Sequence, residues 1–80
     1  MSDSIPPPKT INQLTPRQLE IIALLAEEYS NKNIATILSI SGETVKKHIF
    51  KARRKMNLEN RIQLIVMFVM WRERKSVTNP

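Results

Sequence analysis

The fold is decided by residues 30–57, which read SNKNIATILSISGETVKKHIFKARRKMN. Ser30 and Ser41 each stand directly before an apolar pattern of helical spacing, and a serine oxygen there accepts a hydrogen bond from a free amide of the first turn. The sequence therefore predicts two short helices, at residues 31–38 and 42–56, joined by a three-residue break. The apolar residues expected on one face of the first are Ile34, Ile37 and Leu38.

The second of these helices has two contrasting faces. Its expected buried stripe consists of Val45, Ile49, Ala52 and Met56. The side chains that point the opposite way, or flank that direction, are Glu43, Lys46, Lys47, Phe50, Lys51, Arg53 and Arg54. Six of the ten residues from Lys46 to Lys55 are basic and none is acidic. Such crowding destabilises a helix without an anionic partner, so a merely solvated charged face is the less favoured interpretation.

Helix signals also occur on both sides of this pair. Thr15 precedes Pro16, which suits the first helical position, and Thr15 with Gln18 forms a capping box. The residues expected on the buried face of this first helix are Ile21, Ile22, Leu25 and Tyr29. Asn60, with Gln63 three residues later, is the expected N-cap of a last helix.

The four helices predict one small all-α domain with no strand and no internal repeat. Residues 1–13 contain three consecutive prolines and no apolar periodicity, so they are expected to form a disordered, flexible tether. The folded domain is expected over residues 14–75, and a frayed tail over residues 76–80.

Length and composition exclude several classes of protein. An 80-residue chain holds one small core, which excludes an enzyme with a cleft between two domains. With no Cys and one His, we expect no disulfide, no metal, no cofactor and no small-molecule ligand. The longest apolar run, Leu64 to Trp71, has eight residues, whereas a membrane-spanning helix needs about 20. The N-terminus lacks the pattern of a secretory signal, so we expect a cytoplasmic protein, and the Met start and short tether are compatible with a stand-alone one.

The positive charge is concentrated in one segment. The chain has 13 Lys and Arg against 7 Asp and Glu, and seven of the basic residues lie between Lys46 and Arg61. Charge focused in this way favours a polyanionic partner. Two short helices joined by a tight break, the second cationic on its outer face, meet the requirements of a helix-turn-helix that places its second helix in a major groove. We therefore predict binding to double-stranded DNA.

Four motifs follow one another in order: LTPRQ at 14–18, SNKNIA at 30–35, ISGETVKKH at 40–48 and KMNLENR at 55–61. They resemble the LuxR/FixJ-type helix-turn-helix domain of bacterial response regulators and quorum-sensing regulators. The resemblance covers residues 14 to about 71, and it implies sequence-specific DNA binding for transcriptional control, with no enzymatic activity. It also implies a four-helix fold whose third helix enters the major groove and whose fourth helix commonly forms a dimer.

Three residues depart from the family's usual pattern. Gln18 stands where Glu is usual, which keeps a buried hydrogen bond and removes a charge. Glu28 and Asn57 stand where Gly is frequent, at helix ends. Asn57 tolerates the left-handed conformation that such ends require, and Glu28 does so less readily.

Contacts with DNA are assigned residue by residue. Lys46 matches the family's recurrent Thr-Val-Lys position, which implies a contact with phosphate or a base edge. Lys47 is expected to reach guanine acceptors, and Arg54 to meet phosphate. Two further candidates are the Thr44 hydroxyl, which can bond a phosphate at the helix start, and Phe50, which can contact a thymine methyl group. The remaining candidates are Lys51, which flanks the same face, and Lys32 and Arg61, which are expected to contact phosphates.

Four residues have a structural alternative. Thr44 can serve as a capping contact only, and Phe50 can fold back on its own helix or contact a partner subunit. Arg61 can hold the fold together instead of a phosphate. For His48, packing or a phosphate contact is favoured over a titratable switch or a metal ligand.

The fourth helix carries two apolar stripes about 180° apart, by the helical period of 3.6 residues. One consists of Ile62, Ile65, Val66 and Val69, and the other of Leu64, Met67, Phe68 and Trp71. A helix in so small a domain buries one face, so the stripe that ends in Phe68 and Trp71 is expected to form a two-fold homodimer on an inverted-repeat site. The alternative is that the tether or a further domain covers it.

A second interpretation remains open from the sequence. The basic helix suits a protein-interaction module that docks on an acidic partner such as RNA polymerase. Salt-dependent binding to duplex DNA with discrimination among sequences separates the two interpretations.

Overall fold

The computed structural model describes residues 11–77, apart from the side chains of Asn12 and residues 75–77. A short 3₁₀ helix, η2 (Ile11–Gln13), precedes four α-helices. These are α1 (Pro16–Ala26), α2 (Asn31–Leu38), α3 (Gly42–Met56) and α4 (Arg61–Val77). The predicted all-α, four-helix fold is confirmed, and no strand occurs among the described residues.

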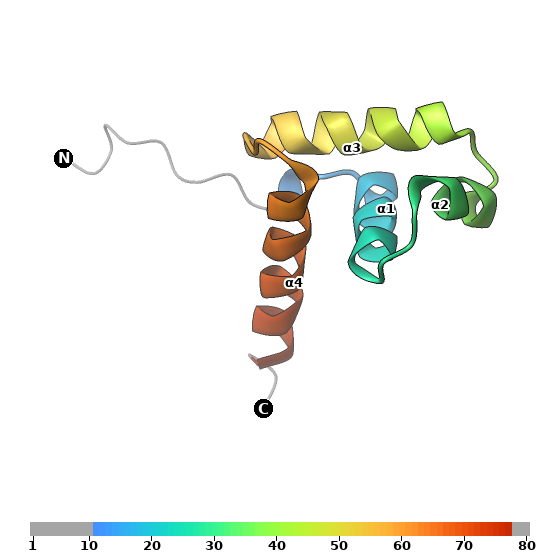
Figure 1. Ribbon diagram of the computed structural model, residues 1–80. Coiled ribbons are helices and arrows are strands. Elements are labelled where there is room, and N and C mark those ends of the chain that lie inside the picture. The colour runs from blue at the N-terminus through green and yellow to red at the C-terminus, as the bar shows by residue number, and fades with distance from the viewer. Residues whose placement is uncertain (1–10, 78–80) are drawn as a thin grey trace.

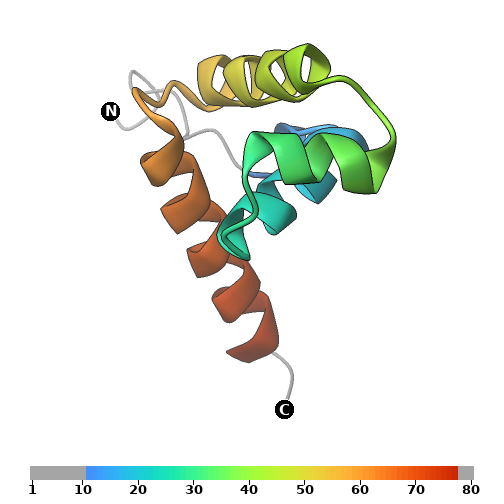
Figure 2. The same ribbon diagram turned by 45° about the vertical axis from the view of Figure 1, so that its right-hand side comes forward.

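The helix α3 lies across one end of the molecule. In Figure 1, α1, α2 and α4 all lie on the same side of α3, and the turned view in Figure 2 shows the same arrangement. The helix α1 packs against α2, α3 and α4, and α2 packs against α3. One side of α3 is therefore held by the core, and the backbones of the other helices leave its opposite side uncovered.

The predicted capping residues begin the first three helices. The Gln18 amide donates to Thr15 Oγ1 (3.1 Å), and the Thr15 amide donates to Gln18 Oε1 (2.9 Å), which completes the capping box. Gln18 is buried, so this departure from the family's usual Glu keeps its hydrogen bonds without burying a charge. Ser30 and Ser41 cap α2 and α3 in the same way.

The core consists of apolar side chains from all four helices and η2. Its largest fully buried members are Ile21, Ile22, Ile34, Val45 and Leu64. Two expectations for the core were wrong, because Tyr29 and Ile37 are exposed. Tyr29 follows the end of α1 at Ala26, so the helical period does not bring it to the buried face. The other α2 residues that pack against the core are Ala35 and Leu38, which lie on the opposite side of Ile34 from Ile37, so Ile37 falls outside the packed face.

The folded region extends further at both ends than predicted. Ile11 is buried in the core, and η2 packs against α4, so a tether that continues to residue 13 is wrong. A single isoleucine gives no periodicity from which this packing follows. The helix α4 continues to Val77, two residues into the predicted tail. The rest of the predicted tether and tail, residues 1–10 and 78–80, lies outside the described residues.

The orientation of α4 differs from the predicted one: Ile62 and Val66 of the expected inner stripe are exposed, whereas Ile65 and Val69 pack against the core. Leu64 and Phe68 are 0% and 6% exposed and belong to the core. Met67 and Trp71 are partly buried against it, and the rings of Phe68 and Trp71 pack with centroids 5.7 Å apart. The assignment of Leu64, Met67, Phe68 and Trp71 to a free dimer face is therefore wrong. Both stripes of α4 are apolar at helical spacing, so periodicity does not determine which one packs inward.

A left-handed residue follows each of the first three helices. The φ angles are 72° at Glu28, 57° at Ser39 and 59° at Asn57. The Glu28 amide donates to the Leu25 carbonyl (2.9 Å), and the Tyr29 amide donates to the Leu24 carbonyl (3.2 Å). These bonds satisfy free carbonyls at the end of α1, so Glu28 is kept in a conformation that favours glycine. The helix stop predicted at Asn57 is confirmed.

Glu28→Gly is expected to raise the free energy of unfolding by about 0.5–1 kcal/mol. Glycine removes the steric penalty of the left-handed conformation, and this gain exceeds the stability that is lost because glycine makes the unfolded chain more flexible. Urea denaturation followed by the helical circular dichroism signal measures the change. The matched control is Glu27→Gly, at an exposed position with φ −86°, which should lower stability by a similar amount. Equal destabilisation by both substitutions contradicts the prediction.

Candidate nucleic-acid interface

A tight turn fixes the angle between α2 and α3. Ser39 adopts the left-handed conformation, and the Ile40 amide donates to the Ala35 carbonyl (2.9 Å), which ends α2. Ser41 then caps α3, and its Oγ accepts from the Thr44 amide (3.0 Å). Because the turn is so short, the two helices pack directly against each other, as a helix-turn-helix requires.

The outward face of α3 agrees with the prediction in its exposure. The predicted inner stripe of Val45, Ile49, Ala52 and Met56 is buried. The predicted outer residues Lys46, Lys47, Phe50, Lys51 and Arg54 are all exposed. They lie around the helix from the buried stripe, and in Figure 1 no other helix covers the side of α3 that faces away from the core. The helix therefore presents five candidate contact residues on one free, mainly cationic face, referred to below as the α3 outward face.

Thr44 takes part in the N-terminal cap of α3. Besides the backbone bond to Thr44, Ser41 Oγ lies 2.9 Å from Thr44 Oγ1, and either hydroxyl is the donor. This is the capping contact that the sequence left as an alternative for Thr44. Thr44 remains partly exposed, and its contact with phosphate stays a prediction.

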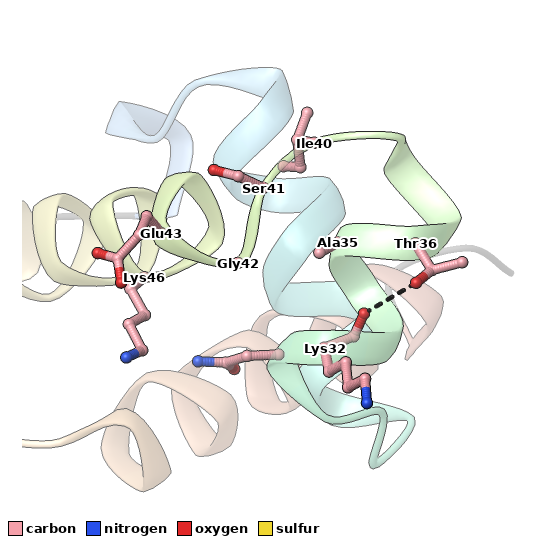
Figure 3. Close-up of a pocket in the computed structure, with 9 residues that line it drawn as sticks. Lys32, Ala35, Thr36, Ile40, Ser41, Gly42, Glu43 and Lys46 are labelled. Carbon is pink, nitrogen blue, oxygen red and sulfur yellow. Dashed lines mark hydrogen bonds between the residues drawn. The ribbon is translucent and has the colours of Figure 1, made fainter.

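An open groove of about 560 Å³ separates the start of α2 from the start of α3. Lys32 lies on the α2 rim and Lys46 on the α3 rim, and Figure 3 shows both side chains extending toward the lower edge of the view. Glu43 also lines this groove. The two lysines come from different helices and are 14 positions apart in the chain, so the fold brings together two of the predicted phosphate contacts.

Arg61 joins the start of α4 to the start of α2. Its Nη1 donates to Asn31 Oδ1 (3.1 Å), across 30 residues of sequence. Arg61 therefore has the structural contact that the sequence left open, although its side chain is exposed. Asn31 was not singled out from the sequence, because its partner is distant in the chain.

Phe50 has two arginines beside it. The guanidinium carbons of Arg53 and Arg54 lie 5.9 Å and 5.7 Å from the centroid of the Phe50 ring. Such distances are within the range of a cation–π contact. The spacing of three and four residues places these side chains on neighbouring turns, so this cluster was open to prediction, but Arg53 was placed only at the margin of the face.

Other kinds of site find little support among the described residues. No group of three or more His, Cys, Asp or Glu there is arranged to hold a metal ion. Within residues 11–77, no helix is long and apolar enough to cross a membrane. His48, the single histidine, is partly buried on α3.

Sequence comparison relates the chain to a family of bacterial regulatory proteins. The family model described as bacterial regulatory proteins, luxR family, matches residues 12–68. The nitrate/nitrite response regulator protein NarP of Escherichia coli (strain K12) is 42% identical over 59 residues, which cover 74% of this chain and 27% of NarP. The transcriptional regulatory protein DegU of Brevibacillus brevis is 40% identical over 58 residues, which cover 72% of this chain and 25% of DegU.

The chain thus spans about a quarter of the length of these curated relatives. The matched region contains all of α1, α2 and α3 and the first half of α4, which is the part that forms and supports the α3 outward face. The resemblance drawn from the four motifs is confirmed. This chain belongs to the luxR family of bacterial regulatory proteins, a family of DNA-binding transcription regulators and not a class of enzymes.

Proposed function

We propose that this chain recognises a specific sequence of double-stranded DNA by inserting the α3 outward face into the major groove. The observation that carries the proposal is that face itself, which is exposed, mainly cationic and fixed to the core by a buried stripe on the same helix. A major groove about 12 Å wide admits one α-helix.

The contacts divide into base contacts and phosphate contacts. Lys47 lies near the start of α3 at the centre of the outward face, where it reaches the N7 and O6 acceptors of guanine. Lys32 and Lys46 lie on opposite rims of the groove between α2 and α3, so they suit a DNA backbone that passes over it. Arg54 and Lys51 meet phosphates further along the helix, and Arg61 reaches the backbone while it keeps its bond to Asn31.

Selection of binding sites from random duplexes at two salt concentrations tests this proposal. We expect enrichment of one half-site sequence at both concentrations, with lower affinity at the higher one, because phosphate contacts release counterions. No enriched sequence at either concentration contradicts the proposal. Binding that is salt-dependent but indifferent to sequence favours the protein-interaction module, with an acidic partner such as RNA polymerase.

Lys47→Ala and Lys46→Ala are expected to act differently on the selected site. Removing Lys47 should lower the affinity for the preferred base at one position about tenfold and relax the preference there. Removing Lys46 should lower the affinity for all DNA sequences by the same factor and reduce the slope of log affinity against log salt concentration by about 0.9. Fluorescence anisotropy with duplexes that differ at single positions measures both. An equal loss on every sequence for Lys47→Ala contradicts its assignment as a base contact.

We further propose that two copies bind an inverted repeat through α4. The corrected orientation of this helix leaves Ile62, Val66 and Met70 exposed by 68%, 50% and 61%. They recur every four residues, so they form a continuous apolar stripe on the face of α4 opposite to the core. A two-fold axis places the same stripe of a second copy against it, and the resulting pair matches a palindromic site.

A further inference from the structure

Phe50 is an apolar side chain in cationic surroundings. The residue is 50% exposed on the α3 outward face. Lys46 and Lys47 precede it by one turn, and Arg53 and Arg54 follow it by one turn. Both guanidinium carbons lie within 6 Å of the ring centroid, at 5.9 and 5.7 Å. The two arginines hold the ring beside them, and part of it remains open to whatever α3 contacts.

The chemistry of Phe50 restricts what it contacts in a major groove. A phenyl ring neither donates nor accepts a conventional hydrogen bond. If it displaced water from a phosphate or from a polar base edge, it could not replace the hydrogen bonds that the water made. The one apolar group that base edges present in the major groove is the C5-methyl group of thymine. Contact with that methyl removes apolar surface of both partners from water.

The position of Phe50 along α3 also limits which base it reaches. Phe50 follows Lys47 by three residues, which is about 4.5 Å along a helix axis at 1.5 Å per residue. Base pairs repeat about every 3.4 Å along a strand. The base that meets Phe50 therefore lies within about two base pairs of the base that meets Lys47.

We infer that Phe50 is a specificity-determining residue that recognises the methyl group of one thymine in each half-site, within about two base pairs of the Lys47 contact. This inference rests on the proposed function, because it needs α3 in the major groove. It adds the identity of one base and the chemical group by which that base is recognised.

The test is a pair of parallel selections, one from random duplexes that contain thymidine and one from duplexes in which deoxyuridine replaces it. Deoxyuridine pairs like thymidine and lacks only the methyl group. For the unmodified protein, we expect one position where thymine is preferred and where uracil is enriched about fourfold less, the factor for one buried methyl-sized group. At that position, 5-methylcytosine should bind better than cytosine.

Phe50→Ala should remove the difference between thymine and uracil at this position. Phe50 lies outside the core, so the variant keeps its helical circular dichroism and melting temperature. Lys51→Ala, also exposed on the same face, is the matched control and should lower affinity while it keeps the methyl dependence.

Two results overturn the inference about Phe50. One is equal enrichment of thymine and uracil at every position by the unmodified protein, and the other is a methyl dependence that survives Phe50→Ala. Both leave sequence-specific binding intact, so they are distinct from a failure of the proposed function, in which neither library yields an enriched sequence.

Discussion

Leu64→Ala is expected to lower the free energy of unfolding by about 3 kcal/mol and the melting temperature by more than about 10 °C. Leu64 is fully buried, on the face of α4 that packs against α1, α3 and η2. Truncation there removes apolar contacts and leaves a cavity, which a domain this small tolerates poorly. Thermal unfolding followed by circular dichroism measures the change.

The matched control for Leu64→Ala is Ile62→Ala, which removes a side chain of the same size from the exposed stripe of the same helix. Exposed positions of this kind change stability by less than about 0.5 kcal/mol. A loss of stability as large for Ile62→Ala as for Leu64→Ala means that both sides of α4 are buried and that the proposed dimer stripe is part of the core.

The double substitution Val66→Glu with Met70→Glu is expected to leave the monomer folded and to weaken binding to a duplex with two half-sites about 100-fold. Both residues lie on the exposed stripe of α4, so new carboxylates there repel their symmetry mates and stay solvated in the monomer. Binding to a single half-site should change little, because one copy suffices for it. Titration of both duplexes measures the difference.

Arg72→Glu is the control for charge, because it changes the net charge by the same amount at an exposed position of α4 that lies about 200° around the helix from Met70, off the stripe. It should affect the two duplexes equally. Sedimentation equilibrium gives the state of the unmodified protein directly. A monomer at high concentration, with unchanged binding by the double variant, contradicts the homodimer and leaves room for a different occupant of this stripe.

The helix starts and the orientation of α3 were predictable from the sequence because they depend on local chemistry. Each cap joins residues three positions apart, as in Ser41 and Thr44. On α3, a single apolar stripe among charged residues leaves one possible orientation. On α4 both stripes are apolar, and only the volume between the packed helices determines that Leu64 faces inward. Ile11 is likewise buried through a contact that no periodicity indicates.

The candidate site was predictable to a similar extent. The exposure of Lys46 and Lys47 follows from the helical period alone. The bond between Arg61 and Asn31 joins two helices that are distant in the chain, and a single sequence contains no sign of it. The groove that sets Lys32 opposite Lys46 depends on the angle of the turn at Ser39, which appears only when the two helices are packed.

The central claim is that the α3 outward face distinguishes one DNA sequence from another. Its most direct test is a titration of the protein with the selected duplex and with a scrambled duplex of the same base composition, at about 50 and about 200 mM salt. We predict that the selected duplex binds at least about 1,000-fold more tightly at both concentrations, while both affinities fall as salt rises. Equal affinity for the two duplexes at each salt concentration contradicts the claim. It would mean that α3 binds DNA through its charge alone, without distinguishing sequences.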